Sequence, residues 1–327
     1  MRAMVVSEFG SPQVLTLQDI PTPEPGPGEV RVRLYAAGVN PADTYIRSGS
    51  YAFYRPTLPY VPGFDGAGVV DKLGSGVKRL REGQRVFVAS LLAARKTGAY
   101  GEMTVCDSDA VHPLPDAISF SQGAGLGVPA QTAYRALFQR ARLAPGETVL
   151  IHGASGGVGT LAVQLAWACG ARVIATAGSA LSREMLRKLG AHVTLNHNEP
   201  GYLEEVADLT EGRGPDVIIE MLANVNLEND MRIVAMFGRV VIVGSRDSLD
   251  FTPRLMMIKE STLLGMALWN SPPAEYAQAN TAIAAALEAG ILHPELGEEL
   301  PLEQAALAHR NIIEGGGKRG KMVLTME

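Results

Sequence analysis

Residues 148–159, TVLIHGASGGVG, are the stretch whose residue types and spacing most directly predict a chemical role. A short apolar run is followed there by small residues, with three glycines among the last four positions. A glycine backbone can approach a ligand without a Cβ clash. A helix expected over residues 158–169 would begin with unpaired amides at the positive end of its dipole, which is a site for a pyrophosphate. Because Ala154 stands where the GxGxxG pattern has its first glycine, this loop alone leaves nucleotide binding open.

The segments after this loop alternate between strand-like and helix-length runs. Apolar, strand-like runs lie at residues 171–175, 193–196, 216–220 and 240–243. This alternation is typical of an α/β fold with a doubly wound parallel sheet, the Rossmann arrangement. Such sheets bind ligands at the carboxyl ends of their strands, and the segment VGSR, residues 243–246, ends the fifth strand at that edge.

A second group of reactive side chains occupies residues 38–51, GVNPADTYIRSGSY. Its polar residues lie in a proline-started turn that is expected to continue as a short helix. One interpretation is a capped helix, with Asn40 before Pro41 as its N-terminal signal and Asp43 in its first turn. The other is a catalytic role for one of these side chains, and the residues themselves leave both open. The polar residues are Asn40, Asp43, Tyr45, Arg47 and Tyr51.

Metal and disulfide chemistry find little support in the remaining reactive residues. The two cysteines, Cys106 and Cys169, are far apart and have no partners at metal-ligand spacing. None of the six histidines forms an HxH or HxxxH pair, so surface or hydrogen-bonded structural roles are expected for most of them. A structural zinc and a disulfide framework are therefore not expected. Cys106 lies in a strand-like run without an adjacent base, which favours a buried structural thiol over a nucleophile.

The composition limits the classes of partner. The chain has 327 residues, 46% of them hydrophobic, which is enough for about two domains. Its net charge of −5 argues against nucleic acid as the main partner. No apolar run reaches transmembrane length, and the N-terminal residues MRAMVVSEFG lack the apolar core of a signal peptide. We therefore expect a cytoplasmic protein that has no membrane partner.

Two domains are predicted from the pattern of strands and turns. The N-terminal third contains short strand-like runs separated by glycine and proline turns, which is typical of a distorted barrel. A glycine-rich segment at residues 124–137 is the expected crossing into the Rossmann domain. The tail, with a helix expected over 302–313 and a strand over 321–325, is too short to fold alone. The predicted domains are therefore 1–125 together with 294–327, and 126–293.

Several motifs taken together resemble those of a known family over essentially the whole chain. The strongest are GVNPADTYIRSG, PYVPGFDGAGVV, AYRAL, HGASGGVG, IIEMLANVNL, VVIVGSR and GKMVL. The chain resembles the zeta-crystallin-like NADPH:quinone oxidoreductases, a zinc-free branch of the medium-chain dehydrogenase/reductase superfamily. The resemblance implies a GroES-like, β-rich catalytic domain beside the Rossmann domain. It also implies NADPH-dependent reduction of a quinone that is held against the nicotinamide in the cleft between the domains.

The sequence departs from the zinc-dependent alcohol dehydrogenases of that superfamily at the metal ligands. Asn40 stands near the position of a ligand cysteine, Phe64 and Asp65 replace the histidine and glutamate of a GHE motif, and the four-cysteine lobe is missing. We therefore expect that no metal is bound and that alcohol oxidation is disfavoured.

The cofactor preference is predicted from the end of the second Rossmann strand. NAD-dependent enzymes usually carry an aspartate or glutamate there, whereas residues 175–179, ATAGS, offer no carboxylate to repel a 2′-phosphate, so NADPH is the expected cofactor. The resemblance places Tyr45 against the cofactor and Thr132 near the nicotinamide, and we add Arg183 as a further candidate beside the adenosine phosphate. A surface turn is the other interpretation of His197. The cofactor-binding residues expected from the loop and the resemblance are Ser155, Gly156, Gly157, Val158, Gly178, His197, Asn226, Val243, Gly244, Ser245 and Arg246.

The catalytic residues expected for a quinone reductase are Tyr45 and Asn40, which would orient the acceptor and stabilise the negative charge that grows on its oxygen. The residues do not distinguish a one-electron step from a hydride step. A second interpretation is an NADPH-dependent enone or 2-alkenal reductase with the same fold. A third is a crystallin-like structural or RNA-binding protein, which the acidic charge and the intact phosphate loop weaken.

A homodimer or homotetramer is expected from the apolar strand at residues 262–266, TLLGM, near the end of the nucleotide-binding sheet. Left unpaired, such an edge would be prone to association, and in the family it pairs across a twofold axis. The alternative is that the helix expected over residues 274–289 covers this edge within one chain.

Overall fold

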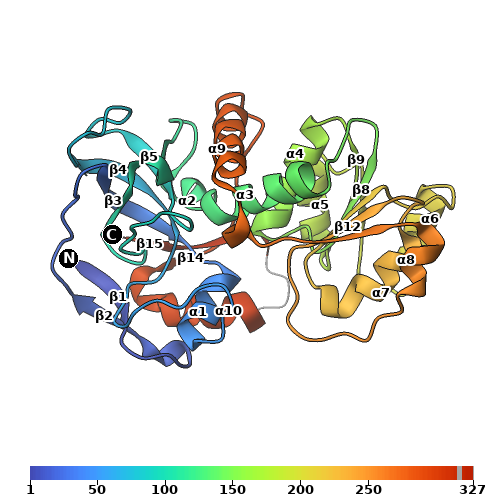
Figure 1. Ribbon diagram of the computed structural model, residues 1–327, viewed down its shortest axis with the longest axis horizontal. Coiled ribbons are helices and arrows are strands. Elements are labelled where there is room, and N and C mark those ends of the chain that lie inside the picture. The colour runs from blue at the N-terminus through green and yellow to red at the C-terminus, as the bar shows by residue number, and fades with distance from the viewer. Residues whose placement is uncertain (315–318, 327) are drawn as a thin grey trace. The chain divides into compact units, whose positions relative to one another are not determined.

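The computed structural model of the chain describes residues 1–314 and 319–326. The chain folds into two compact units, one formed by Met1–Pro129 with His293–Glu327 and the other by Ala130–Leu292 (Figure 1). The sequence analysis placed the two crossings close to these boundaries, after residues 125 and 293. Residues 315–318 and 327 of the expected tail lie outside the described residues.

The first unit is built on a seven-stranded sheet with the order β14-β15-β3-β4-β5-β7, in which β6 also pairs with β3. All pairs in this sheet are antiparallel except β14 with β15. A separate antiparallel pair is formed by β1 (Arg2–Val6) and β2 (Leu15–Asp19). The strands of the larger sheet are β3 (Glu29–Gly38), β4 (Asp65–Leu73), β5 (Arg85–Ala89), β6 (Met103–Asp107), β7 (Val111–Pro113), β14 (Leu296–Pro301) and β15 (Lys321–Thr325).

The sequence of β3 shows why these segments form strands. Val30, Val32 and Leu34 are buried, while Arg33 and Tyr35 between them are exposed, so the alternation of two fits a half-buried strand. Strand β15 pairs with the end of β3, which confirms the prediction that the tail returns to the first unit. This pairing makes the C-terminal strand an interior member of the sheet.

The helices of the first unit are short. They are α1 (Pro41–Ser48), α2 (Phe120–Gly123) and α10 (Ala305–Glu314), with the 3-10 turns η1 (Pro12–Val14), η2 (Ser108–Ala110) and η5 (Leu302–Gln304). The helix expected over residues 302–313 thus begins as the tight turn η5 and becomes α-helical at Ala305. Cys106 on β6 is fully buried, and burial raises the pKa of its thiol to about 12, which confirms a structural thiol over a nucleophile.

The second unit contains a six-stranded sheet with the order β10-β9-β8-β11-β12-β13, all pairs parallel. Numbered from its first strand this order is 3-2-1-4-5-6, so the predicted α/β Rossmann fold is confirmed. The two central strands, β8 and β11, are mainly apolar and fully buried, as in sheets that helices cover on both faces. The strands of this sheet are β8 (Thr148–Ile151), β9 (Arg172–Thr176), β10 (Val193–Leu195), β11 (Val217–Glu220), β12 (Arg239–Ile242) and β13 (Thr262–Gly265).

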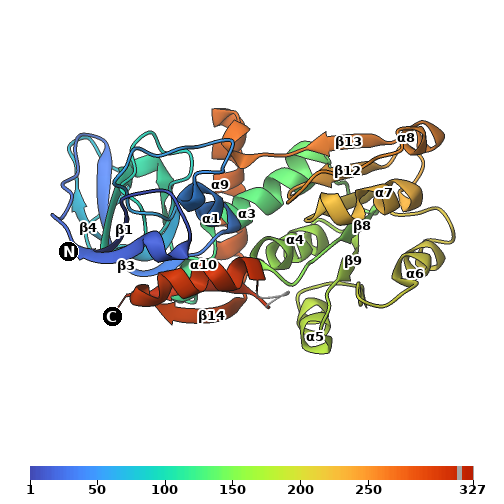
Figure 2. The same ribbon diagram turned by 90° about the horizontal axis from the view of Figure 1, so that it is seen from below.

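The helices of the second unit follow the strands in turn, and α4 packs beside β8 and β9 while α7 packs beside β11 and β12 (Figure 2). They are α4 (Gly157–Ala168), α5 (Ala180–Lys188), α6 (Tyr202–Leu209), α7 (Ala223–Ile233), α8 (Arg254–Lys259), η4 (Leu268–Asn270) and α9 (Pro273–Glu288). Helix α3 (Gly127–Tyr134) precedes them and continues into the π-helical segment η3 (Arg135–Arg140). As predicted, the TLLGM strand β13 ends the sheet.

Across the described residues, every helix is too short or too polar to cross a lipid bilayer.

Packing alone requires the glycine at position 159. A Cβ there would lie 2.5 Å from both the Cα and the carbonyl oxygen of Ala154, and these backbone atoms cannot rotate away. We expect Gly159→Ala to destabilise the protein by about 1–3 kcal/mol in equilibrium urea denaturation. Gly156→Ala is the matched control, because a Cβ at Gly156 would meet nothing nearer than the Gly153 oxygen at 4.0 Å. Equal unfolding free energies for the two variants would contradict this assignment.

Candidate active site

The loop between β8 and α4 has an open backbone at its tip. Gly156 is the N-cap of α4 and has an extended conformation, with φ −82° and ψ 177°. Since no atom would crowd a Cβ at Gly156, packing does not explain the glycine, and its small size leaves room for a ligand at the helix start. Two hydrogen bonds connect the loop to the end of β9. The backbone N–H of Gly153 donates to Thr176 Oγ1 at 3.1 Å, and that of Ala154 donates to the Thr176 carbonyl oxygen at 2.8 Å.

The segment after β9 brings together three residues that the sequence analysis named. A Cβ at Gly178 would lie 3.3 Å from His197 Nε2 and 2.6 Å from Asn198 Nδ2, so Gly178 faces both side chains. The Arg183 guanidinium donates to the carbonyl oxygens of Ala177 and Gly178, at 3.2 and 3.4 Å. Burial lowers the pKa of His197, with the charges of His152 and Arg183 adding to the effect. Asn198 is a neighbour that the sequence analysis missed.

The ends of β11 and β12 place the other named segments side by side. Asn226 on α7 donates from Nδ2 to Glu220 Oε1 at 3.2 Å. The backbone N–H of Val243 donates to the Glu220 carbonyl oxygen at 2.9 Å, and the N–H of Arg246 donates to Asn224 Oδ1 at 3.0 Å. Residues 155–158, 178, 197, 226 and 243–246 therefore all follow the carboxyl ends of strands in one sheet, where such folds bind ligands. That they contact a cofactor stays a prediction.

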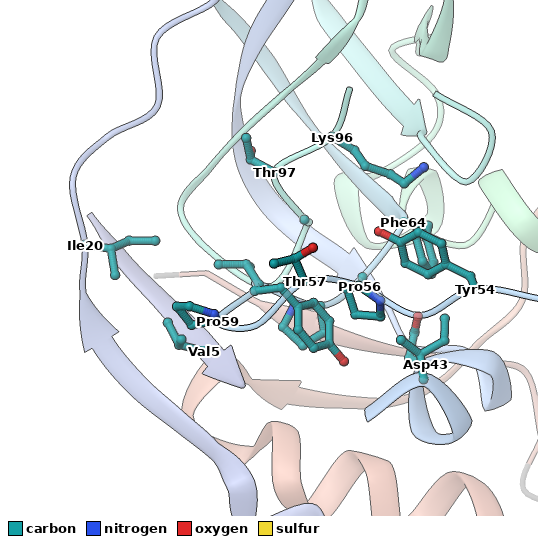
Figure 3. Close-up of a pocket in the computed structure, with 16 residues that line it drawn as sticks. Val5, Ile20, Asp43, Tyr54, Pro56, Thr57, Pro59, Phe64, Lys96 and Thr97 are labelled. Carbon is teal, nitrogen blue, oxygen red and sulfur yellow. The ribbon is translucent and has the colours of Figure 1, made fainter. Parts of the chain in front are cut away.

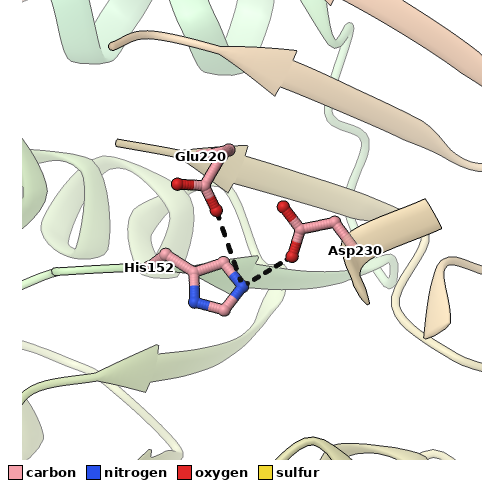
Figure 4. A group of neighbouring side chains, drawn as sticks. All are labelled: His152, Glu220 and Asp230. Carbon is pink, nitrogen blue, oxygen red and sulfur yellow. Dashed lines mark hydrogen bonds and ion pairs between the residues drawn. The ribbon is translucent and has the colours of Figure 1, made fainter. Parts of the chain in front are cut away.

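A buried triad of ionisable side chains lies just beneath these segments (Figure 4). His152 Nε2 is 2.9 Å from Asp230 Oδ1 and 3.9 Å from Glu220 Oε2, and all three side chains are buried. Burial raises the pKa of both carboxyl groups and lowers that of the imidazole. The sequence analysis missed this group because its members stand 68 and 78 positions from His152. The available signal for a buried cluster was one charged residue at the end of an apolar strand, Glu220, and another on the next helix, Asp230.

The first unit contains a second buried polar network, centred on Asn40. The Asn40 side chain donates to Asp65 Oδ2 at 2.8 Å and accepts from Lys321 Nζ at 2.6 Å. Lys321 Nζ also lies 3.6 Å from Asp65 Oδ2, and Val128 N–H donates to Asp65 Oδ1. Desolvation raises the pKa of Asp65 and lowers that of Lys321. This contact was not predicted from the sequence either, because Lys321 lies near the opposite end of the chain from Asn40 and Asp65.

Asn40 has a structural role at the start of α1. It is the N-cap residue and forms a capping box with Asp43, whose Oδ2 accepts from the Asn40 backbone N–H at 2.8 Å, in agreement with the capped-helix interpretation. The side chain of Asn40 is also bonded to Asp65 and Lys321. Asn40 thus links α1 to the buried ion pair.

Asp43 extends the network towards α10. Its Oδ2 accepts from the hydroxyl of the fully buried Tyr100 at 3.1 Å, and that hydroxyl is also 3.1 Å from His309 Nε2. Burial raises the pKa of Asp43 to about 7 and lowers that of His309 to about 3. His309 is therefore neutral at physiological pH, in agreement with the expectation of a structural histidine.

Tyr45 presents its hydroxyl without a partner among the described residues. It lies on α1 two positions after Asp43, is half-buried, and stacks its ring on Tyr51, with the centroids 6.4 Å apart and the planes 11° apart. A phenol in this state is able to donate a hydrogen bond to a ligand.

A pocket of about 500 Å³ lies in the first unit beside α1 (Figure 3). Its wall includes aromatic, proline and aliphatic side chains, among them Tyr54, Pro56 and Ile46. Asp43 and Lys96 supply a carboxyl group and an ammonium, and the Lys96 Nζ lies 5.3 Å from the centroid of the Tyr54 ring. The volume falls within the ~300–1,000 Å³ of typical ligand pockets, and the sequence analysis did not predict it.

Comparison with known proteins agrees with this architecture. Residues 26–116 match the alcohol dehydrogenase GroES-like domain, and residues 157–285 match the zinc-binding dehydrogenase family. A quinone oxidoreductase of Rattus norvegicus is 45% identical over 327 residues, covering 100% of this chain and 98% of the relative. A 2-haloacrylate reductase of Burkholderia sp is 31% identical and covers 98% of both chains.

Two solved structures share the fold over the full length of both chains. One, described as an NAD-dependent alcohol dehydrogenase, is 33% identical with a TM-score of 0.91. The other, a mycobacterial protein complexed with NADPH, is 28% identical with a TM-score of 0.87.

We expect removal of the Lys321 ammonium to destabilise the first unit strongly. Lys321→Met leaves Asp65 as a buried carboxylate without its cation, which should lower the free energy of unfolding by about 3–5 kcal/mol in urea denaturation. The double variant Lys321→Met, Asp65→Asn should recover part of this loss. Lys72→Met is the control, since Lys72 pairs with Glu24 on the exposed surface and should change stability by less than about 1 kcal/mol. A Lys321→Met variant as stable as the Lys72→Met control would refute the expectation.

Proposed function

Since this chain belongs to the quinone oxidoreductase family of the medium-chain dehydrogenase/reductase superfamily, we propose that it transfers reducing equivalents from NADPH to quinones. The chain is an oxidoreductase of the NAD(P)H-using type. The observation that carries the choice of quinone is the chemistry at the positions where the zinc enzymes of this superfamily hold their metal.

The residues at those positions do not fit a zinc ion. Phe64 has no ligand atom, and Asn40 and Asp65 already bind the Lys321 ammonium in a buried setting. A second cation placed there would be repelled by this ammonium and would have to displace it. We therefore propose a zinc-independent reaction, which suits an acceptor such as a quinone that needs no Lewis acid to take up electrons.

The proposed preference for NADPH is supported by the residues beyond β9. Gly178, His197 and Arg183 gather there, and none of the three is acidic. A 2′-phosphate would meet the His197 imidazole, the Asn198 amide and the Arg183 guanidinium. NAD-dependent enzymes instead carry a carboxylate at this strand end, which binds the ribose hydroxyls. The solved relatives do not decide the cofactor, because one is described as NAD-dependent and another was solved with NADPH. The proposed preference therefore rests on the side chains at the end of β9.

The bound NADPH would supply the reducing equivalents, and the chain would supply orientation and charge stabilisation. We propose that residues 243–246 and Asn226 hold the ribose and nicotinamide side, with Thr132 near the nicotinamide. Tyr45 then donates its unengaged hydroxyl to the acceptor or the cofactor, and Asn40, whose amide is already bonded, fixes the start of α1. The pocket beside α1, whose wall includes Tyr54, Tyr60 and Phe64, offers aromatic surface on which a quinone ring could stack. Binding of the acceptor between the two domains stays a prediction.

Reduction of an enone or 2-alkenal is the second candidate. It is supported by the 31% identical relative, whose name describes reduction of a haloacrylate, a compound with a carbon–carbon double bond beside a carboxylate. That reaction requires delivery of a proton as well as a hydride, so it would make greater demands on Tyr45 than quinone reduction does.

We also propose a homodimer or homotetramer formed through β13. This strand pairs with β12 on one side and ends the described sheet on the other, with its terminal residues exposed. An unpaired edge of this kind is a template for pairing with the same strand of a second copy.

The cofactor assignment predicts a selective effect of a carboxylate at position 178. Gly178→Asp should weaken NADPH binding at least ~10-fold through repulsion of the 2′-phosphate, while NADH binding changes much less. Gly178→Ala is the matched control, since both variants add a Cβ that must displace the Asn198 amide. Dissociation constants measured by titration of each nucleotide provide the check. Equal weakening of NADPH and NADH, or an equal effect of alanine, would contradict the assignment.

The reaction is tested by following NADPH oxidation with ortho-quinones, para-quinones and enones in the presence and absence of a chelator. We expect quinone-dependent oxidation that the chelator does not affect. Tyr45→Phe should lower turnover at saturating quinone by less than about tenfold, with little change in NADPH affinity, because quinones need little proton assistance. Tyr51→Phe, which removes the neighbouring stacked phenol, serves as the control. Complete loss of turnover in Tyr45→Phe with intact NADPH binding would favour the enone reductase.

A further inference from the structure

Three ionisable side chains from three separate elements meet in the interior of the second unit (Figure 4). His152 follows β8, Glu220 ends β11 and Asp230 lies on α7. They are 2%, 0% and 0% exposed, respectively. None of them belongs to the residues proposed to touch the cofactor or the acceptor, so their burial calls for another explanation.

The charges of these three groups do not balance unless protons are shared. Two ionised carboxylates beside one neutral imidazole would place two negative charges in a medium that solvates them poorly. Glu220 Oε2 and Asp230 Oδ2 accept no hydrogen bond from the described residues, and His152, Glu220 and Asp230 each place a nitrogen or oxygen atom within 4.8 Å of the other two. A proton on one carboxyl group would remove one of the two negative charges and supply a donor to this cluster. The burial and closeness of the three groups therefore favour at least one proton among Glu220, Asp230 and His152.

The same carboxyl group of Glu220 also holds the proposed cofactor segment. Its Oε1 accepts from the backbone N–H of Leu222 and from Asn226 Nδ2. The backbone oxygen of Glu220 accepts from Val243 N–H, so both segments proposed for the ribose and nicotinamide depend on this one residue. A hydrogen bond to an ionised carboxylate is about twice as strong as one to the neutral acid.

We infer that Glu220 is the positioning residue for Asn226 and that the proton it shares with Asp230 and His152 sets how firmly Asn226 is held, and hence how tightly the dinucleotide binds. The inference rests on the proposed cofactor site. With the proton on the histidine or on Asp230, Glu220 is ionised and Asn226 is fixed. With the proton on Glu220, the hydrogen bonds to Leu222 and Asn226 weaken and the segment is held less firmly.

The pH at which this change occurs follows from the burial of the triad. Burial raises the pKa of both Glu220 and Asp230 to about 7, so protonation falls in the physiological range. The other titratable groups that face the triad are Tyr202 on α6 and His197 after β10, with Arg183 beyond His197. The pKa of Tyr202 is raised to about 12 and that of His197 is lowered, so neither takes up a proton near neutral pH.

The sign of the effect distinguishes the triad from the direct ligands of the phosphate. Protonation of the triad as the pH falls loosens Asn226 and weakens dinucleotide binding. Protonation of His197 would instead add positive charge beside the 2′-phosphate and strengthen binding of NADPH. Because binding favours the deprotonated Glu220, NADPH binding near pH 7 should release protons.

The test is calorimetric titration of the full-length protein with NADPH between pH 6 and 8, in buffers of different ionisation enthalpy. For the wild type we expect the dissociation constant to rise by about fivefold from pH 8 to pH 6, with net proton release on binding near pH 7. Glu220→Gln, which mimics the protonated acid, should bind at pH 8 about as weakly as the wild type at pH 6, with less proton release. The 2′-phosphate is present in both titrations, so the difference between the two proteins reports the triad.

Asp230→Asn provides a second variant should Glu220→Gln fail to fold, and it should likewise reduce the proton release. Glu228→Gln is the control on the same helix, because Glu228 bonds to Thr252 and Arg232 outside the triad, and it should match the wild type. NADPH binding with the same pH dependence and proton release in wild type and in the triad variant would overturn this inference and leave the proposed function standing. Failure of the wild type to bind NADPH would overturn the proposed function and the inference with it. A stoichiometric divalent ion in the purified protein, together with pH dependence abolished by a chelator, would replace proton sharing with metal binding.

Discussion

The first unit depends on a buried cation, the ammonium of Lys321, which is 4% exposed. It binds the Asn40 side chain, 281 positions away in the sequence, and lies beside the Asp65 carboxylate. Burying an ammonium without an anion is costly, so the position of β15 is tied to the start of α1 and the start of β4. The approach is close enough to require a glycine, since a Cβ at Gly38 would lie 2.2 Å from the Ala124 oxygen and 3.0 Å from Lys321 Cε.

The two units neutralise buried carboxyl groups in different ways. In the first unit Asp65 is paired with the ammonium of Lys321. In the second unit Glu220 and Asp230 have only the imidazole of His152 beside them, so a mobile proton balances the charge. The Asp65 ion pair is linked through Asn40 to the helix that carries Tyr45, whereas the Glu220 carboxyl group is bonded to Asn226 of the proposed cofactor segment.

The regular elements could be read from the sequence because their signals are local. The strand expected over residues 321–325 is β15 with the same bounds, and the β-α repeat predicted the Rossmann sheet. The glycine loop predicted an open helix start, but the sequence could not separate Gly159, which packing requires, from Gly156, which packing does not. The buried polar contacts escaped prediction because each joins lone residues from distant segments. Neither the Asn40 bond to Lys321 nor the meeting of His152 with Asp230 leaves a spacing pattern that could be recognised.

The insertion of β15 beside β3 has a consequence for the order in which the protein can be made. All six strands of the second unit lie within one continuous stretch, so that sheet can form as soon as residues 130–292 have left the ribosome. The first unit starts earlier in synthesis but lacks β14 and β15 until residues 296–325 have been made, which leaves residues 36–38 of β3 unpaired on one side and Asp65 without the Lys321 ammonium. Although its residues emerge first, the N-terminal unit is therefore the last to be completed, and the nascent chain carries an open sheet edge throughout elongation.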